Sequence, residues 1–364
     1  MKPFSIRSQT IKVGMVFHKN PLAPQSSIDL IRLRAISGGL IRKGIETEIL
    51  APVHQDGVMA GSVPVRPLHH IMKGQYDIIK TCYHFSMELI QDYEGPIVSR
   101  IVRVVDDCLP ERDENWRERL MQCQERISRR ASVLVLNNVE NKKRWQFFYG
   151  KALPVILVPT GCPMHVPPPR RNPFDGKKRA ILFLGSIAAP RMIAILNTLA
   201  DRLDEARVHV VGVNKVCWYG KGEGGDIHPS IVQHGEIPEE DIWDYIYHAD
   251  MGLALATGPH AFDNDLSKIC SYLRGGLPVL SEAPVVNNDL IRRRGLGRIF
   301  RLDDMADLIA GAKSLLDYPP APETRKAAMA FMAAEHSWDR RVEVYERLFS
   351  RLTGSALRQA ACKG

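Results

Sequence analysis

The feature that most constrains the fold is a regular alternation of short apolar runs with amphipathic stretches. Near the start, 11–17 is typical of a buried strand, and apolar residues then recur at helical spacing from Ile28 to Leu40. Ser27 can cap this helix, and Gly44 follows its end. Strands and helices in such succession predict a parallel, doubly wound sheet. The other strands expected in this half are 45–50, 77–81, 97–105, 133–137 and 155–158, with a helix over 114–130.

The alternation breaks once, over 160–178, which is rich in proline, glycine and arginine. Such a segment is typical of an interdomain linker. The pattern then restarts, so we predict an α/β chain of two Rossmann-like domains that face each other across a cleft. The second half is expected to contain strands at 180–184, 208–211, 231–234, 251–256 and 278–280, and helices at 192–203, 305–316, 323–335 and 339–352. The predicted boundaries are 1–160, a linker 161–178, a second domain 179–337, a terminal helix 338–353 and a tail 354–364.

Composition excludes several classes of protein. A length of 364 residues suits two α/β domains of about 150 residues each. The seven cysteines include no Cys-x-x-Cys pair, which argues against a disulfide framework or a thiolate zinc site, and we expect no metal. No apolar run reaches about 18 residues and 1–12 lacks a signal-peptide core, so a cytoplasmic protein is expected. The net charge of +8 comes with no nucleic-acid-binding signature, which favours phosphorylated small molecules or anionic lipid over nucleic acid.

The most informative segment is 263–279, DNDLSKICSYLRGGLPV. Its apolar residues mark one buried helix face, while Asn264, Lys268 and Ser271 fall on another. Because the helix follows a strand through a Gly-Pro loop, its positive end should point into the cleft, where Lys268 adds a full charge. These features fit a nucleoside diphosphate. The alternative is a solvated lysine on an amphipathic helix.

This segment resembles the donor-site helix of the family 4 (group 1) retaining glycosyltransferases, which have the GT-B fold. In that family a lysine precedes a Glu-Tyr pair and a Gly-x-Pro-Val turn, and Lys268, Tyr272 and Gly276 match this pattern. Ser271 stands where the family has a ribose-binding glutamate, and Asp263 occupies the second acidic position eight residues upstream. Since a serine makes one neutral hydrogen bond where a carboxylate makes stronger ones, weaker donor binding is expected.

Two further segments resemble the family in the same order. In 181–191, a glycine turn at Gly185 and a basic residue, Arg191, resemble the elements that hold the donor phosphates. Gly185 permits close backbone approach, and Arg191 would pair with a phosphate, unless it is a helix-start arginine facing water. The segment 231–253 resembles the one that binds the nucleobase through its backbone, with Gly235, Glu236 and Ile237 as the contacts.

The N-terminal half carries the expected acceptor side and catalytic residues. His84 resembles a histidine near the transferred sugar, although a lone histidine is more often structural. Asp106 and Asp107 resemble the Asp-Asp of bacterial cell-surface polysaccharide transferases in this family, where one could orient an acceptor hydroxyl or merely cap a turn. Ser26 and Ser27 occupy a loop that usually lines the acceptor side. A helix from 337–338 onward resembles one that crosses back to the N-terminal domain.

The resemblance implies transfer of a sugar from a nucleoside diphosphate sugar, UDP- or GDP-linked, to an acceptor hydroxyl, with retention and without a bound cofactor. The acceptor could be a polysaccharide, a lipid-linked sugar or a small metabolite, and a lipid-linked acceptor would bring peripheral contact with the inner face of a membrane. Two alternatives remain open at this point. One is a sugar-nucleotide epimerase of the same fold. The other is a non-catalytic nucleotide-sugar-binding scaffold, which Ser271 favours.

Overall fold

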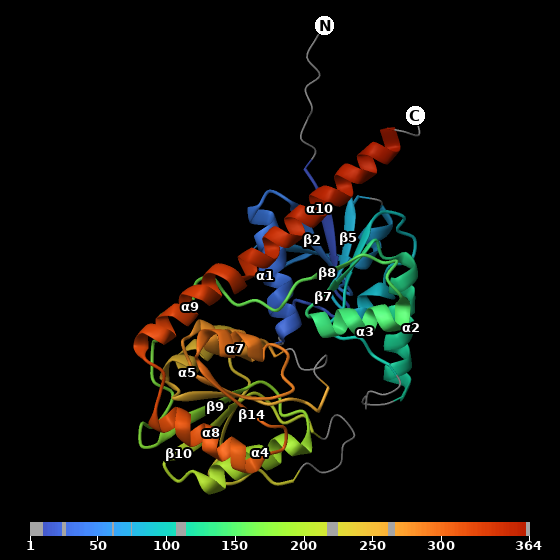
Figure 1. Ribbon diagram of the computed structural model, residues 1–364. Coiled ribbons are helices and arrows are strands. Elements are labelled where there is room, and N and C mark those ends of the chain that lie inside the picture. Colours follow the sequence, from blue (N-terminus) through green and yellow to red (C-terminus); the bar gives the residue numbers. More distant parts are fainter. Residues whose placement is uncertain are drawn as a thin grey trace.

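The computed structural model describes residues 10–361 except 24–26, 60–61, 74, 107–113, 217–224 and 261–265. Two α/β domains lie one beyond the other, and the chain passes between them twice (Figure 1). It leaves the first domain after its last strand and returns to it through two long C-terminal helices. The predicted fold class, two Rossmann-like domains, is confirmed.

In the N-terminal domain, the described residues form an eight-stranded sheet in the order β3-β4-β2-β1-β5-β6-β7-β8. Every pair is parallel except β3 with β4. One apolar core joins the sheet to α1 and the last helix of the chain, and another joins it to α2 and α3. The elements are β1 (Lys12–Val16), α1 (Ile28–Arg42), β2 (Glu46–Ala51), β3 (Gly57–Met59), β4 (Val63–Pro67), η1 (Leu68–Lys73), β5 (Ile78–Thr81), η2 (His84–Met87), β6 (Ile97–Arg100), α2 (Glu114–Arg130), β7 (Val133–Leu136), α3 (Val139–Tyr149) and β8 (Val155–Leu157).

In the C-terminal domain, the described strands form a six-stranded parallel sheet in the order β11-β10-β9-β12-β13-β14. Helices α4 and α8 cover one face, and α5, α6, α7 and α9 cover the other. The elements are β9 (Arg179–Leu184), α4 (Pro190–Arg202), β10 (Ala206–Val211), β11 (Val232–Gly235), η4 (Glu239–Asp241), α5 (Ile242–His248), β12 (Met251–Ala254), α6 (Ser267–Arg274), β13 (Val279–Glu282), α7 (Asn288–Arg294), β14 (Gly297–Phe300), α8 (Met305–Asp317), α9 (Pro322–His336) and α10 (Trp338–Ala361).

Local hydrogen bonds explain why one prediction from the sequence is confirmed and another is wrong. Ser27 caps α1 as predicted, because its hydroxyl accepts the Leu30 N–H at 3.3 Å. The strand predicted over 97–105 is wrong beyond Arg100. The Ile101 N–H still donates to the Val135 carbonyl of β7 at 3.3 Å, but further on the buried backbone bonds to side chains of neighbouring helices: the Val104 N–H donates to Asn141 and the Val105 N–H to Gln124, both at 2.8 Å.

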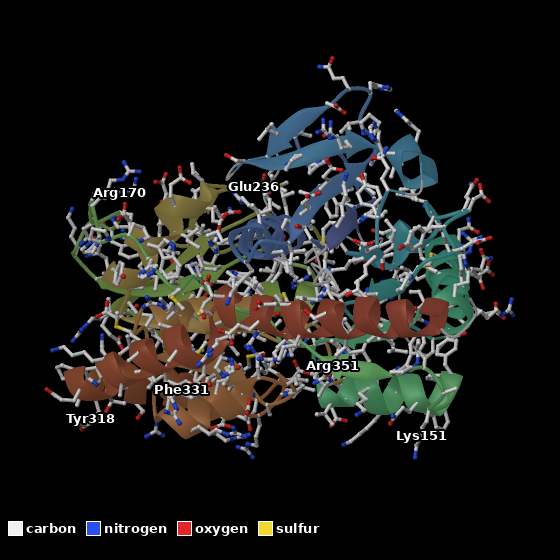
Figure 2. The ribbon with its side chains drawn as sticks, turned by 90° about the horizontal axis from the view of Figure 1, so that it is seen from above. Lys151, Arg170, Glu236, Tyr318, Phe331 and Arg351 are labelled. Carbon is white, nitrogen blue, oxygen red and sulfur yellow. The ribbon has the colours of Figure 1, made fainter. Side chains whose placement is uncertain are left out.

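Helix α10 belongs to the core of the N-terminal domain although it follows the C-terminal domain in sequence. It packs along α1 so closely that a Cβ on Gly39 would lie 2.3 Å from Val342 Cγ2. Trp338, Tyr345 and Phe349 of α10 are buried in the same core. Figure 2 shows Phe331, on α9, beside one domain and Arg351, on α10, beside the other. The last two helices therefore fasten the domains together.

Candidate functional site

Three glycine turns lie side by side at the carboxyl ends of β9, β10 and β11. Gly185, Gly212 and Gly235 have φ angles of +101°, +140° and +71°. The Gly212 N–H donates to the Gly235 carbonyl at 2.8 Å, and a Cβ on Gly212 would lie 2.3 Å from the Gly185 carbonyl oxygen. A side chain at Gly212 is therefore excluded, and the strand ends present bare backbone to a ligand. Gly185 and Gly235 are among the residues predicted from the sequence, whereas Gly212 is not.

Lys268, in the first turn of α6, reaches this edge of the sheet. Its Nζ lies 3.8 Å from the centroid of the buried Phe183 ring. The same Nζ lies 3.7 Å from where a Cβ on Gly185 would be. No residue within the described part of the chain forms an ion pair with this amine, and burial lowers the pKa of Lys268 to about 7. An anion on the glycine turns would restore the charged form of the amine.

Tyr272 fixes the position of α6 and therefore that of Lys268. Its buried hydroxyl accepts the Leu184 N–H at 2.9 Å and lies 3.1 Å from the Leu182 carbonyl, to which it can donate. Gly252 leaves room for the ring, since a Cβ there would lie 2.7 Å from it. The predicted helix phase is confirmed: Ile269, Cys270 and Leu273 are buried. Ser271 is partly exposed, on the side of the helix away from the core.

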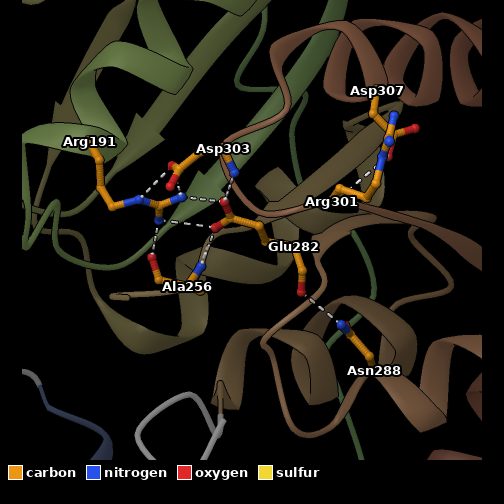
Figure 3. A network of polar contacts seen from close by, with 7 residues as sticks. All are labelled: Arg191, Ala256, Glu282, Asn288, Arg301, Asp303 and Asp307. Atoms are coloured by element: carbon orange, nitrogen blue, oxygen red, sulfur yellow. Dashed lines mark hydrogen bonds and ion pairs between the residues drawn. The ribbon is translucent and has the colours of Figure 1, made fainter. Parts of the chain in front are cut away.

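Arg191, predicted to contact a donor phosphate, lies within a network of polar contacts (Figure 3). Its guanidinium donates to Asp303 from Nε at 3.0 Å and from a terminal nitrogen at 2.6 Å. It also donates to both carboxylate oxygens of the buried Glu282, and to the Ala256 carbonyl at 2.6 Å. These bonds use all five guanidinium N–H groups. In this arrangement Arg191 joins the start of α4 to the ends of β12 and β13, and a phosphate contact would need some of these bonds to be exchanged.

The segment after β11 faces the N-terminal domain. Glu236 is exposed and lies on that side of its domain (Figure 2), while Ile237 packs against the core. Glu239 accepts a hydrogen bond from Arg34 of α1 at 2.6 Å, which ties the segment across the domain boundary. The predicted nucleobase contacts at Gly235, Glu236 and Ile237 thus lie at the domain boundary. Asp263 and Asn264 lie outside the described residues.

A pocket of about 260 Å³ lies between the domains. The N-terminal domain supplies most of its wall, from the first turns of α1 and the loops that follow β5, β6 and β7. From the C-terminal domain comes Ser267, the residue before Lys268, so the pocket adjoins the start of α6. Ser27 precedes its first lining residue, and Ser26 lies outside the described residues. The lining residues are Ile28, Asp29, Arg32, Tyr83, Arg100, Val102, Arg103, Asn137, Thr160 and Ser267.

Two of the predicted catalytic residues, His84 and Asp106, are buried in the N-terminal domain. His84 is fully buried, and its Nε2 lies 3.0 Å from the Arg103 carbonyl. Because a carbonyl only accepts, Nε2 carries the proton, and burial lowers the pKa of His84 to about 3. His84 therefore holds the Arg103 loop as a neutral ring. Asp106 is buried in an ion pair with Arg144 of α3, and Asp107 lies outside the described residues.

A metal-binding cluster and a membrane-spanning helix are both absent from the described part of the chain. Within it, no group of three or more histidine, cysteine or acidic side chains is arranged to hold a metal ion. None of the helices described here is long and apolar enough to cross a membrane.

Two Rossmann-like domains with glycine turns at one sheet edge and a pocket between the domains are the arrangement of the GT-B class of fold. Solved structures share it over nearly the whole chain. Anabaena HepE in complex with UDP-glucose has 13% identity and a TM-score of 0.71, over 94% of this chain and 100% of that one. Sucrose-phosphate synthase from Thermosynechococcus elongatus has 12% identity and a TM-score of 0.65, over 97% and 100%. WaaG, a glycosyltransferase involved in lipopolysaccharide biosynthesis, has 14% identity and a TM-score of 0.64, over 94% and 100%. No family model and no curated protein sequence matches the chain.

Proposed function

We propose that this protein is a glycosyltransferase that moves a sugar from a nucleoside diphosphate sugar to an acceptor hydroxyl. The observation that carries the proposal is the Lys268 amine at the Gly185 turn, without an ion-pair partner in the described part of the chain. Structures of HepE, which shares this fold, were solved with UDP-glucose and with UDP. The same class of donor would place its diphosphate on the glycine turns of this chain.

The mechanism follows from where negative charge develops. As the bond between the sugar and the diphosphate breaks, charge accumulates on the leaving phosphate oxygens. A protonated Lys268, held over Phe183 in a site of low polarity, stabilises that charge more strongly than it would in water. Tyr272 keeps α6 in place, so the amine needs no rearrangement during the reaction. The acceptor would approach from the interdomain pocket, which reaches α6 at Ser267.

The donor ribose would lie beside Ser271, one turn beyond Lys268 on the partly exposed face of α6. A serine there offers a single neutral hydrogen bond, so the diphosphate contacts carry most of the donor affinity. The serine at this position, where the resembled family has a glutamate, also supports a second candidate function, that of a non-catalytic protein that binds nucleotide sugars. A sugar-nucleotide epimerase of the same fold has no specific observation in its favour.

A surface on α3 supports peripheral attachment to a membrane. Phe147 and Phe148 expose 82% and 45% of their surface, and their ring centroids lie 5.0 Å apart. Lys143 is exposed on the same helix, and Lys151, just beyond it, points away from the domain (Figure 2). Exposed aromatic rings beside lysines are typical of a surface that rests on anionic lipid. We propose that this surface, Phe147, Phe148, Lys143 and Lys151, brings the enzyme to a lipid-linked acceptor.

Calorimetric titration with UDP, GDP and their glucose, galactose and mannose conjugates tests the proposal. We expect one nucleotide series to bind the wild-type chain and to bind Lys268→Met at least fivefold more weakly. Product analysis then separates the candidates. A transferase consumes the sugar nucleotide only with an acceptor or water, an epimerase converts it alone, and a scaffold binds it without turnover. If no nucleoside diphosphate binds, the donor-site assignment is wrong.

A further inference from the structure

The short segment that follows the Gly235 turn is held from two sides. It leads from the end of β11 into η4, which carries a charged contact in each direction. Arg170, in the segment before β9, forms an ion pair with Asp241. Arg34 of α1, in the other domain, donates to the Glu239 carboxylate at 2.6 Å. The N-terminal domain therefore has a direct hold on a segment that begins at the glycine turns.

The segment is stiff enough to carry this hold back to the turn. The Gly235 carbonyl accepts the Gly212 N–H at 2.8 Å, and the Ile237 side chain packs against the core of the domain. Pro238, just before η4, has its φ fixed near the observed −55° by its ring. A displacement of Glu239 would consequently reach the Gly235 turn instead of being absorbed in a flexible loop.

The Arg34–Glu239 pair is sheltered more than an ordinary surface ion pair. The two side chains expose 35% and 31% of their surface, whereas Arg42 and Asp339, a second pair made by α1, expose 66% and 41%. Burial raises the pKa of Glu239, and the charge of Arg34 works against that rise. Since partly buried charges are screened less by water and salt, Arg34 is the stronger of the two ties.

We propose that Arg34 is a positioning residue for the donor: its ion pair with Glu239 holds the segment 236–239 where a nucleotide on the glycine turns would contact it. This inference rests on the proposed function, because it concerns the donor site of that reaction. A ligand that meets an already ordered segment loses less free energy to ordering it. The N-terminal domain thus supports nucleotide affinity without contacting the nucleotide. By reciprocity, a bound nucleotide strengthens the ion pair between the domains.

Two measurements on the full chain test this role. Titration calorimetry with UDP and with GDP compares the wild type with Arg34→Gln, Glu239→Gln and the double variant. Arg34→Lys keeps the charge, and Arg42→Gln is the matched control, because Arg42 lies on the same helix and is 66% exposed. Hydrogen exchange of the amides in 236–241, measured on the ligand-free protein, reports on the segment without any nucleotide.

We expect Arg34→Gln and Glu239→Gln each to weaken nucleotide binding about fivefold. The double variant should bind no more weakly than either single variant, since both changes break the same pair. Arg34→Lys should keep most of the affinity. Exchange in 236–241 should be faster in Arg34→Gln and unchanged in Arg42→Gln. Wild-type affinity in Arg34→Gln, independent effects of the two substitutions, or unchanged exchange would overturn the inference.

The outcomes also separate this inference from the proposed function. If the wild type binds neither nucleotide while exchange in 236–241 still depends on Arg34, the proposed function falls and the ion pair keeps its hold on the segment. If nucleotide binds wild type and Arg34→Gln equally, the proposed function stands and the inference fails. Should Arg34→Gln not fold, the exchanged pair Arg34→Glu with Glu239→Arg replaces it, and its affinity should return toward that of the wild type.

Discussion

Lys268 and Phe183 form the contact on which the donor site depends: the amine lies 3.8 Å from the ring centroid, at the carboxyl end of β9. An aromatic face stabilises a cation by about 0.5–2 kcal/mol, which is less than the cost of taking a lone ammonium out of water. The lowered pKa of Lys268 reflects that imbalance. A bound diphosphate beside the amine would stabilise the charged form and raise this pKa again.

Nucleotide affinity should therefore depend on pH through Lys268. Its pKa is about 7 in the free protein, and a bound diphosphate raises it. Affinity should be greatest below pH 7 and decline as the pH rises above 7. Binding at pH 8 should take up protons, as calorimetry in two buffers of different ionisation heat would show. Lys268→Met should weaken binding by about 1–3 kcal/mol and abolish the uptake. Unchanged proton uptake in the variant would exclude Lys268 from the site.

Lys268→Met should stabilise the ligand-free protein, although it weakens nucleotide binding. The pKa of Lys268 is below its unfolded value, so the unfolded chain binds more protons from about pH 7 upward, and this group makes stability rise with pH over that range. Lys268→Met should raise the free energy of unfolding at pH 7, and the gain should shrink toward pH 10. Urea unfolding at several pH values measures it. A loss of stability at pH 7 would show that the variant harms packing.

Arg191 should matter for stability rather than for donor binding. Arg191→Met leaves the carboxylate of Glu282, which is fully buried, without its partner. Breaking such a pair costs about 3 kcal/mol or more. Adding Glu282→Gln to the variant should recover part of the loss, and Arg301→Met, whose side chain is 77% exposed, serves as the control. A stable Arg191→Met protein with weakened nucleotide binding would restore the phosphate role predicted from sequence.

Ser271→Glu tests whether the donor ribose lies beside this position of α6. A carboxylate at this partly exposed position should bind the ribose hydroxyls and tighten nucleotide binding by about 1–2 kcal/mol. Ser271→Gln, of nearly equal size but neutral, separates charge from bulk. Equal effects of the two variants would mean that the carboxylate does not meet the ribose.

The surface on α3 should bind anionic vesicles. Phe147→Ser with Phe148→Ser should reduce cosedimentation with vesicles containing phosphatidylglycerol, while nucleotide affinity stays unchanged. Raising salt should release the wild-type protein as its lysines are screened. Tyr318→Ser is the control, because Tyr318 is 80% exposed on the other domain. Equal sedimentation of wild type and double variant would exclude this surface.

Periodicity was enough to predict the fold class, the Ser27 cap and the buried face of α6, because each depends on residues within a few positions of one another. The bonds of Arg191 could not be predicted in this way, since Glu282 and Asp303 lie 91 and 112 residues further along the chain. The lining of the interdomain pocket could not be predicted for the same reason. Arg32, Arg100 and Arg103 belong to no local motif, and only the sheet order brings α1 beside the end of β6. The apolar run after Arg100 led to a wrong strand prediction, because the side-chain amides of Asn141 and Gln124 accept hydrogen bonds from its backbone N–H groups.

The packing of α10 has a consequence for how the chain is made. Val13 and Met15 of the first strand share a core with Trp338, Val342 and Phe349. On the ribosome the N-terminal domain would emerge long before the helix that completes that core. Its apolar surface stays exposed to water while about 180 further residues, the linker and the second domain together, are synthesised at about 5–20 residues per second. A chaperone that covers α1 during those seconds would protect the step of biosynthesis at which this protein is most exposed to aggregation.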